Sequence, residues 1–274
     1  MRWRRHRPLG PTIALALAFG LPWLGCTETT GPDEPFSLEF EALPFPSIVS
    51  GDTLRDIEGN VVPLRAVAYN LRRNPIENAE VSFIVVDTSG SVTLDPSTGY
   101  LVATGTGRGT VRVVASIGGL QSAPLTLEIV APPTTVTRFG TIDTLRYSFS
   151  NPALNTSPPL EVRVTGDSAS APIPFYVVRF RLATVADTIV ARIVDDATRR
   201  SPRDPSGVTY LDTTEASGTR AGVAGRRIRL TPGASLAAVD SIVVLAEVLR
   251  RGVHISGSPV RLVLPVKART TAAP

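Results

Sequence analysis

Short runs in which every second residue is apolar constrain the fold of this chain more than any other feature. In one such run, Val81, Phe83 and Val85 alternate with Ser82 and Ile84. A period of two gives a strand one apolar face, so these runs predict half-buried antiparallel strands. The same pattern recurs at Val111, Val113, Ala115 and Ile117, at Leu125, Leu127 and Ile129, at Val162 and Val164, at Val178, Phe180 and Leu182, at Ile228 and Leu230, and at Val260, Leu262, Leu264 and Val266.

Turn signals separate these runs about every ten residues, as expected of a chain built from hairpins. They lie at residues 58–60, 73–75, 89–91, 95–97 and 118–119. Many short strands with this punctuation are typical of β-sandwiches. We therefore expect an all-β protein.

One segment fits two readings. In residues 235–251, Leu236, Val239, Val243 and Ala246 would share a helical face. The β-branched run 242–244, with Gly233 and Gly252 on either side, favours a strand instead. Residues 148–159 and 197–207 are expected to be loops, either for recognition or simply solvated.

The consecutive prolines Pro132 and Pro133 interrupt the alternation, since proline cannot donate a ladder hydrogen bond. We place a domain boundary there. The expected organisation is a signal peptide (1–25), a flexible tether (26–36), two tandem Ig-like β-sandwich domains (37–131 and 132–268) and a disordered tail (269–274).

The beginning of the chain predicts export. Four arginines among residues 1–7 precede an apolar stretch (9–24), which is the pattern of a cleaved leader. Gly25-Cys26 resembles the lipobox of bacterial lipoproteins, and this resemblance implies a lipid on Cys26 and anchorage in a membrane. Since Thr27 follows the cysteine, the same resemblance implies the outer membrane. Simple cleavage with a free thiol is the alternative.

The charges of the chain are divided unequally. The sequence has 28 Lys+Arg and 24 Asp+Glu, but four of the arginines lie in the leader, so the remainder is neutral. The basic isoelectric point therefore gives no reason to expect nucleic-acid binding. Residues 26–131 carry 6 basic and 13 acidic side chains, whereas residues 132–274 carry 18 and 11. Opposite net charges can help the two halves dock, although salt screens such attraction over about 10 Å.

Residues 45–130 resemble a bacterial Ig-like (Big) domain. The resemblance is carried by segments 51–54, 63–66, 75–83, 95–105 and 109–113, followed by Gly118-Gly119. The second half is similar to invasin-type Ig-like repeats over fewer segments (178–182, 213–218 and 226–233). The resemblance implies a structural or adhesive module outside the cytoplasm and transfers no catalytic residue.

Chemically active side chains are scarce. After the leader the chain has one histidine, His254, and one cysteine, Cys26, so neither a Ser-His-Asp triad nor a zinc site is expected. Residues 105–109 (GTGRG) lack the ending of a phosphate-binding loop and predict a turn. We expect no cofactor and no metal. A calcium site formed by Asp195, Asp196, Asp204 and Asp212 is a minor alternative.

A cluster of arginines (199, 200 and 203, with 250 and 251) is either a solvated surface or a contact for anionic lipid or polysaccharide. We expect a non-catalytic envelope lipoprotein that acts as an adhesion or interaction module towards an unknown envelope protein or polysaccharide. A structural spacer or assembly subunit is the alternative, and a carboxylate-dependent carbohydrate-active enzyme is a remote one.

Overall fold

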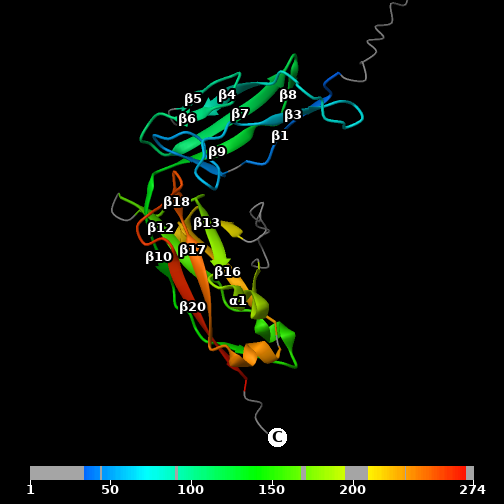
Figure 1. The fold of residues 1–274 in the computed structure, drawn as a ribbon. Helices are drawn as coiled ribbons and strands as arrows, with labels where there is room; N and C mark the ends of the chain where they lie inside the picture. Colours follow the sequence, from blue (N-terminus) through cyan, green and yellow to red (C-terminus); the bar gives the residue numbers. More distant parts are fainter. Residues whose placement is uncertain are drawn as a thin grey trace, which may run out of the picture.

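A computed structural model of the chain describes residues 34–43, 45–89, 92–167, 171–194, 209–231 and 233–269. Cys26, most of the expected tether, the second expected loop (197–207) and the last five residues lie outside the described residues. Figure 1 shows two β-sandwiches arranged end to end. We call them the first sandwich (β1–β9) and the second sandwich (β10–β20).

The first sandwich is made of nine short strands. Its largest sheet has the order β2-β9-β7-β4, with β8 paired to β7, and two-stranded sheets β1-β3 and β5-β6 complete it. The strands are β1 (Ser37–Phe40), β2 (Ser47–Val49), β3 (Ala66–Tyr69), β4 (Ser82–Thr88), β5 (Val92–Leu94), β6 (Leu101–Ala103), β7 (Gly109–Ile117), β8 (Leu120–Gln121) and β9 (Leu125–Val130). The first strand of the large sheet, β2, runs parallel to β9.

The second sandwich packs a four-stranded sheet, β10-β12-β16-β14, against a five-stranded sheet, β11-β20-β17-β13-β15. A small hairpin, β18-β19, projects from it. The elements are β10 (Pro133–Phe139), β11 (Leu145–Tyr147), η1 (Pro152–Asn155), β12 (Leu160–Gly166), β13 (Val177–Leu182), α1 (Val185–Val190), β14 (Ala191–Val194), β15 (Tyr210–Thr213), η2 (Gly218–Arg220), β16 (Val223–Leu230), η3 (Ala234–Ala238), β17 (Ser241–Glu247), β18 (Leu249–Arg250), β19 (Val253–His254) and β20 (Val260–Ala268).

The alternating residues form the cores, which confirms the all-β prediction. Phe83, Val111 and Leu127 are buried in the first sandwich, and Phe180, Ile228 and Leu264 are buried in the second. Burial of the apolar face provides the main driving force for folding, and each fully buried large side chain contributes about 1.5–3 kcal/mol. Each sandwich has a hydrophobic cluster, and the cluster of the second also takes in Val130 of β9, with Phe45 and Val49 packed against it.

The ambiguous segment 235–251 is both helical and extended. Residues Ala234–Ala238 form a 3₁₀ helix, and the favoured strand begins only at Ser241. The expectation of a strand is therefore confirmed for the β-branched part and wrong for the part before it. Leu236 serves the core from the 3₁₀ turn, where it is fully buried.

The expected loop 148–159 is mostly exposed, but two of its polar residues are inside the protein. Asn155 and Ser157 are fully buried within it. The Asn155 side chain accepts a hydrogen bond from Ser148 N–H (2.7 Å) and donates one to the Ser148 carbonyl (2.9 Å). Ser157 Oγ accepts from the backbone N–H of Ile228 at 2.9 Å. The segment is therefore a mainly exposed loop, as expected, and its two buried polar side chains anchor it to the second sandwich.

Candidate functional site

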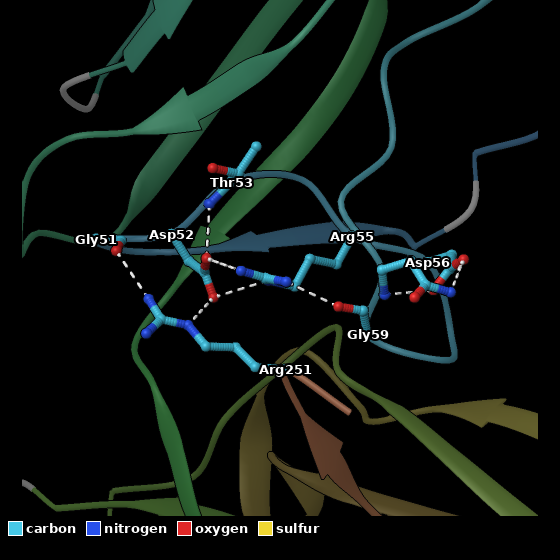
Figure 2. Close-up of polar contacts among 8 residues, drawn as sticks. Gly51, Asp52, Thr53, Arg55, Asp56, Gly59 and Arg251 are labelled. Atoms are coloured by element: carbon cyan, nitrogen blue, oxygen red, sulfur yellow. Dashed lines mark hydrogen bonds and ion pairs between the residues drawn. The ribbon is translucent and has the colours of Figure 1, made fainter. Parts of the chain in front are cut away.

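The junction between the two sandwiches holds the most developed polar cluster in the described part of the chain. Its centre is Asp52, in the turn that follows β2, and the side chain of Asp52 is only 5% exposed. Asp52 Oδ1 accepts a hydrogen bond from the Thr53 backbone N–H at 2.8 Å and from Arg55 Nη2 at 3.0 Å. Figure 2 shows these contacts, with the guanidinium of Arg55 reaching on to the Gly59 carbonyl at 2.7 Å.

The second sandwich supplies a further partner for Asp52. Arg251 Nε donates to Asp52 Oδ2 at 2.8 Å across the junction (Figure 2). Arg251 and Gly252 form the two-residue turn of the β18-β19 hairpin, and both have positive φ (54° and 76°). A tight turn with two positive φ values is the type that matches the twist of paired strands. The hairpin therefore carries Arg251 at its tip, directed towards the first sandwich.

Electrostatics keep Asp52 ionised. Burial alone would raise the pKa of the Asp52 carboxyl, but hydrogen bonds from Arg55, Arg251 and Thr53 outweigh this effect. The pKa of Asp52 consequently lies below its ordinary value. The same contact raises the pKa of Arg251. Asp52 is thus a carboxylate at neutral pH, shared between one arginine of each sandwich.

A second ion pair across the junction also joins an acid of the first sandwich to an arginine of the second. Arg179 Nη1, on β13, lies 3.1 Å from Glu58 Oε2. In both pairs the acid belongs to the first sandwich and the arginine to the second. The opposite charges of the two halves, which the sequence predicts could help docking, therefore meet at this interface.

Apolar and neutral contacts complete the junction. Phe45 packs edge-to-face on Tyr176, with 5.0 Å between ring centroids. Ser47 Oγ donates to the Phe175 carbonyl at 2.8 Å, and Tyr176 Oη donates to the Leu249 carbonyl at 2.6 Å. Burial raises the pKa of Tyr176, so its hydroxyl remains a donor. Together these contacts extend the core of the second sandwich towards the first.

The space left at the junction is small. The recess lined by Asp52, Arg55, Tyr176 and Arg251 has a volume of about 30 Å³. A space of that size holds about one or two water molecules, whereas pockets for metabolites usually exceed about 300 Å³. The recess is therefore too small for a metabolite, and the residues around it hold the two domains together.

Asp212, one of the four candidate calcium ligands, forms an internal ion pair. Its Oδ1 lies 3.3 Å from Arg226 Nη1, and its Oδ2 accepts from Gly225 N–H at 2.7 Å. The two side chains are 6% and 1% exposed, and the pair links β15 of one sheet to β16 of the other. Arg226 also donates to the carbonyl oxygens of Gly225 and Leu211. Asp212 is thus committed to a structural role; Asp195, Asp196 and Asp204 lie outside the described residues.

The structure also places the other candidates that lie within the described residues. His254 is exposed on strand β19, and its Nδ1 lies 2.9 Å from Ser258 Oγ. Residues 105–109 lead into strand β7 and not into a helix. In the described ranges no group of three His, Cys, Asp or Glu side chains is placed to hold a metal ion. Arg250 and Arg251 line the junction recess, whereas Arg199, Arg200 and Arg203 lie outside the described residues, so the expected arginine surface stays a prediction.

Two sequence signals could have indicated the junction. Residues 58–60 and 251–252 are both glycine-containing turns next to charged residues, but their proximity depends on how the sandwiches pack. Cys26 lies outside the described residues, so its lipidation stays a prediction. Within the described residues, no helix has both the length and the apolar character needed to span a bilayer.

Comparisons with known proteins give only distant likenesses. No family model and no curated protein matches the chain. Among solved structures, the adhesin InvE of Yersinia pseudotuberculosis is 15% identical, with a TM-score of 0.32, over 84% of this chain and 58% of that one. The S-layer protein SbsC (residues 31–844) is 12% identical, with a TM-score of 0.28, over 87% of this chain and 28% of that one. The D00-D0 domain of intimin is 10% identical, with a TM-score of 0.25, over 83% of this chain and 98% of that one.

The chain spans a little more than half of the InvE structure and about a quarter of the SbsC structure. All three TM-scores lie below 0.5, so these likenesses do not assign the chain to a family.

Proposed function

We propose that this chain is a non-catalytic, lipid-anchored protein of the cell envelope, whose two sandwiches act together as an interaction module. The observation that carries the proposal is the junction around Asp52. The Asp52 side chain accepts hydrogen bonds from Arg55 of its own sandwich and from Arg251 of the other, which restrains the two domains in one relative orientation. A module that must present a surface at a distance from its anchor benefits from such restraint, because less conformational entropy is lost on binding.

The leader and Cys26 support the envelope location. A basic start, an apolar segment and a small residue before Cys26 form the signal for export and acylation. Lipid on Cys26, followed by Thr27, would place the protein at the outer membrane. An acyl chain on a short polar tether leaves both sandwiches outside the bilayer.

The anchor is tested by intact-mass spectrometry of the membrane fraction, beside a Cys26→Ala variant. We expect a mature N-terminus at Cys26 with added lipid mass, and neither the lipid mass nor processing at this site in the variant. An unprocessed or unlipidated wild-type chain would refute the proposed anchor. Crosslinking in intact cells then tests the interaction module: we expect a Cys26-dependent adduct with an envelope protein or polysaccharide.

A structural spacer or assembly subunit is the second candidate, and the restrained junction favours it as well. A spacer would keep its two domains aligned but would bind no isolated envelope polymer or protein. Purified chain that shows no such binding, yet is recovered in a stoichiometric envelope complex, would favour the spacer. Binding to an isolated component would favour the interaction module.

A carboxylate-dependent enzyme receives no support from the junction recess. The acids that line it are Asp52 and Asp56. Hydrolysis of glycosides needs one carboxyl group with a raised pKa as the acid. The arginines around Asp52 have the opposite effect on its pKa.

A further inference from the structure

The outer face of the sheet β10-β12-β16-β14 brings two arginines into direct opposition. Arg192 on β14 is the cross-strand partner of Arg229 on β16. Both side chains are exposed, because their neighbours Ile193, Ile228 and Leu230 turn into the core. Residues directly opposite in an antiparallel pair have Cβ atoms about 4.5–5.5 Å apart, so two guanidinium groups share one small area of surface.

Other arginines of this face are engaged with neighbouring groups. Arg220 binds Glu161 at 2.5 Å and Glu215 at 2.7 Å. The guanidinium of Arg163 lies 4.3 Å from the centroid of the Phe139 ring and donates to the Thr219 carbonyl. Within the described residues, Arg192 and Arg229 have no carboxylate partner. Like charges placed opposite each other destabilise a sheet, so this arrangement works against folding unless an anion is bound.

We propose that this pair, Arg192 and Arg229, is a binding site for an anionic polysaccharide bearing carboxylate or phosphate groups. The inference rests on the proposed function, because it names the ligand class of the interaction module. Guanidinium groups present planar forks of donors that match carboxylate and phosphate oxygens in pairs. Two forks on adjacent strands can bind successive anionic groups of one polymer.

The position of the pair suits an extended polymer. In the described residues, β14 is the last strand of its sheet, so Arg192 lies on the outermost strand and Arg229 one strand further in. Two arginines on neighbouring strands of an exposed sheet face can contact successive charges of a repeating chain, which a compact metabolite does not offer.

Other polyanions fit this surface less well. Single-stranded nucleic acid is held largely by stacking on exposed aromatic rings, and Phe139, the ring on this face, is covered by Arg163. The pair belongs to the second sandwich, whereas the described chain begins in the first, at the far end of the molecule in Figure 1. Anionic lipid on vesicles is therefore a separate outcome of the binding test.

The test measures binding of the purified full-length chain to polygalacturonate and to poly(glycerol phosphate), with uncharged dextran as a control. We compare the wild type, Arg192→Gln/Arg229→Gln, and the matched variant Arg138→Gln/Arg261→Gln. The matched variant removes the same charge from two other exposed arginines of the second sandwich. We expect salt-dependent binding of at least one anionic polymer, reduced about tenfold in the first variant and less than about twofold in the second.

Several results would overturn the proposal. One is the absence of wild-type binding to both anionic polymers. Another is an equal loss of polymer binding in the two double variants, which would mean that net charge alone decides binding. Self-association that the first variant abolishes, without polymer binding, would assign the face to a second copy. Binding to vesicles containing phosphatidylglycerol, but to neither polymer, would assign it to a lipid surface. The mass measurement on Cys26 is independent, so failure of the anchor and failure of this site are distinguishable.

Discussion

Gly59 of the first sandwich lies in backbone contact with Gly252 of the second. A Cβ atom at Gly59 would fall 2.0 Å from the Gly252 backbone nitrogen, and the φ of Gly59 is +91°. Two turns far apart in the sequence therefore meet where neither has a side chain. This close approach lets Arg251, the neighbour of Gly252, reach Asp52.

Gly59→Ala should loosen the junction, because the methyl group has no room and the backbone is strained. We expect a loss of about 1–3 kcal/mol in unfolding free energy and a wider distribution of distances between spin labels on the two sandwiches. Gly118→Ala is the control: its φ is also positive (+58°) but nothing lies within 4 Å. An unchanged distance distribution in Gly59→Ala would contradict the described contact.

Asp52→Asn should weaken the junction by removing the charge that holds two arginines. The Asp52 side chain is only 5% exposed. We therefore expect the free energy of unfolding at pH 7, measured by urea denaturation, to fall by about 2 kcal/mol. Asp143→Asn, which changes the same charge at an exposed position, should have little effect.

The contribution of Asp52 should also depend on pH. Its pKa is lower in the folded state than in the unfolded state, so the unfolded state binds the proton more readily. The stabilisation is then full above about pH 4 and is lost as the pH falls through the folded pKa. The difference between wild type and Asp52→Asn should narrow below pH 4; a difference that grows in acid would disprove this assignment.

Arg226→Met should destabilise the second sandwich strongly, because it leaves Asp212 buried without its cation. We expect a loss of about 3–5 kcal/mol from chemical denaturation. The double variant Arg226→Met/Asp212→Asn should lose less than the sum of the two single variants, since the residues interact. Arg261→Met, on an exposed arginine, provides the baseline; strict additivity would mean that the pair is not coupled.

Phe83→Ala should remove a central side chain of the first core. Phe83 is 6% exposed and lies 6.1 Å from Phe40 between ring centroids. The cavity should cost about 3–5 kcal/mol. Ile84→Ala, at the adjacent exposed residue, should cost much less. A loss below about 1 kcal/mol for Phe83→Ala would mean that the strand register is wrong.

Arg192→Glu should stabilise the second sandwich by replacing a like-charge pair with an ion pair across β14 and β16. We expect a gain of about 0.2–1 kcal/mol that decreases in high salt. Arg261→Glu is the control, because its cross-strand partner is the uncharged Leu245. A loss of stability in Arg192→Glu alone would show that Arg192 already has a favourable environment.

The strands were the most predictable part of the molecule. Val111, Val113 and Ala115 are fully buried on β7, as their alternation predicts. Local periodicity is sufficient here, since it decides which face of a strand turns inward. The pattern left residues 235–251 open between helix and strand, and it did not indicate that a 3₁₀ turn at Ala234–Ala238 would come before a strand from Ser241.

The buried ion pair could not be predicted by periodicity. Arg226 lies on the same inward face of β16 as Ile228 and Leu230. In the sequence, however, a charged residue at that position looks like a break in the apolar alternation. It is tolerated because Asp212 arrives from the facing sheet. Asp212 therefore looks like a possible metal ligand in sequence and is a structural partner in the fold.

The sequence by itself determined the class of fold and the predicted export signal, because both depend on neighbouring residues: alternation within a strand, and a charge-apolar-cysteine order in the leader. Only the tertiary structure decided that Asp52 faces Arg251, that Gly59 touches Gly252, and that Arg192 opposes Arg229. Each of these relationships joins segments separated along the chain. Their proximity follows from sheet order and domain packing, which reflect the energy of the whole assembly and not the pattern of any one segment.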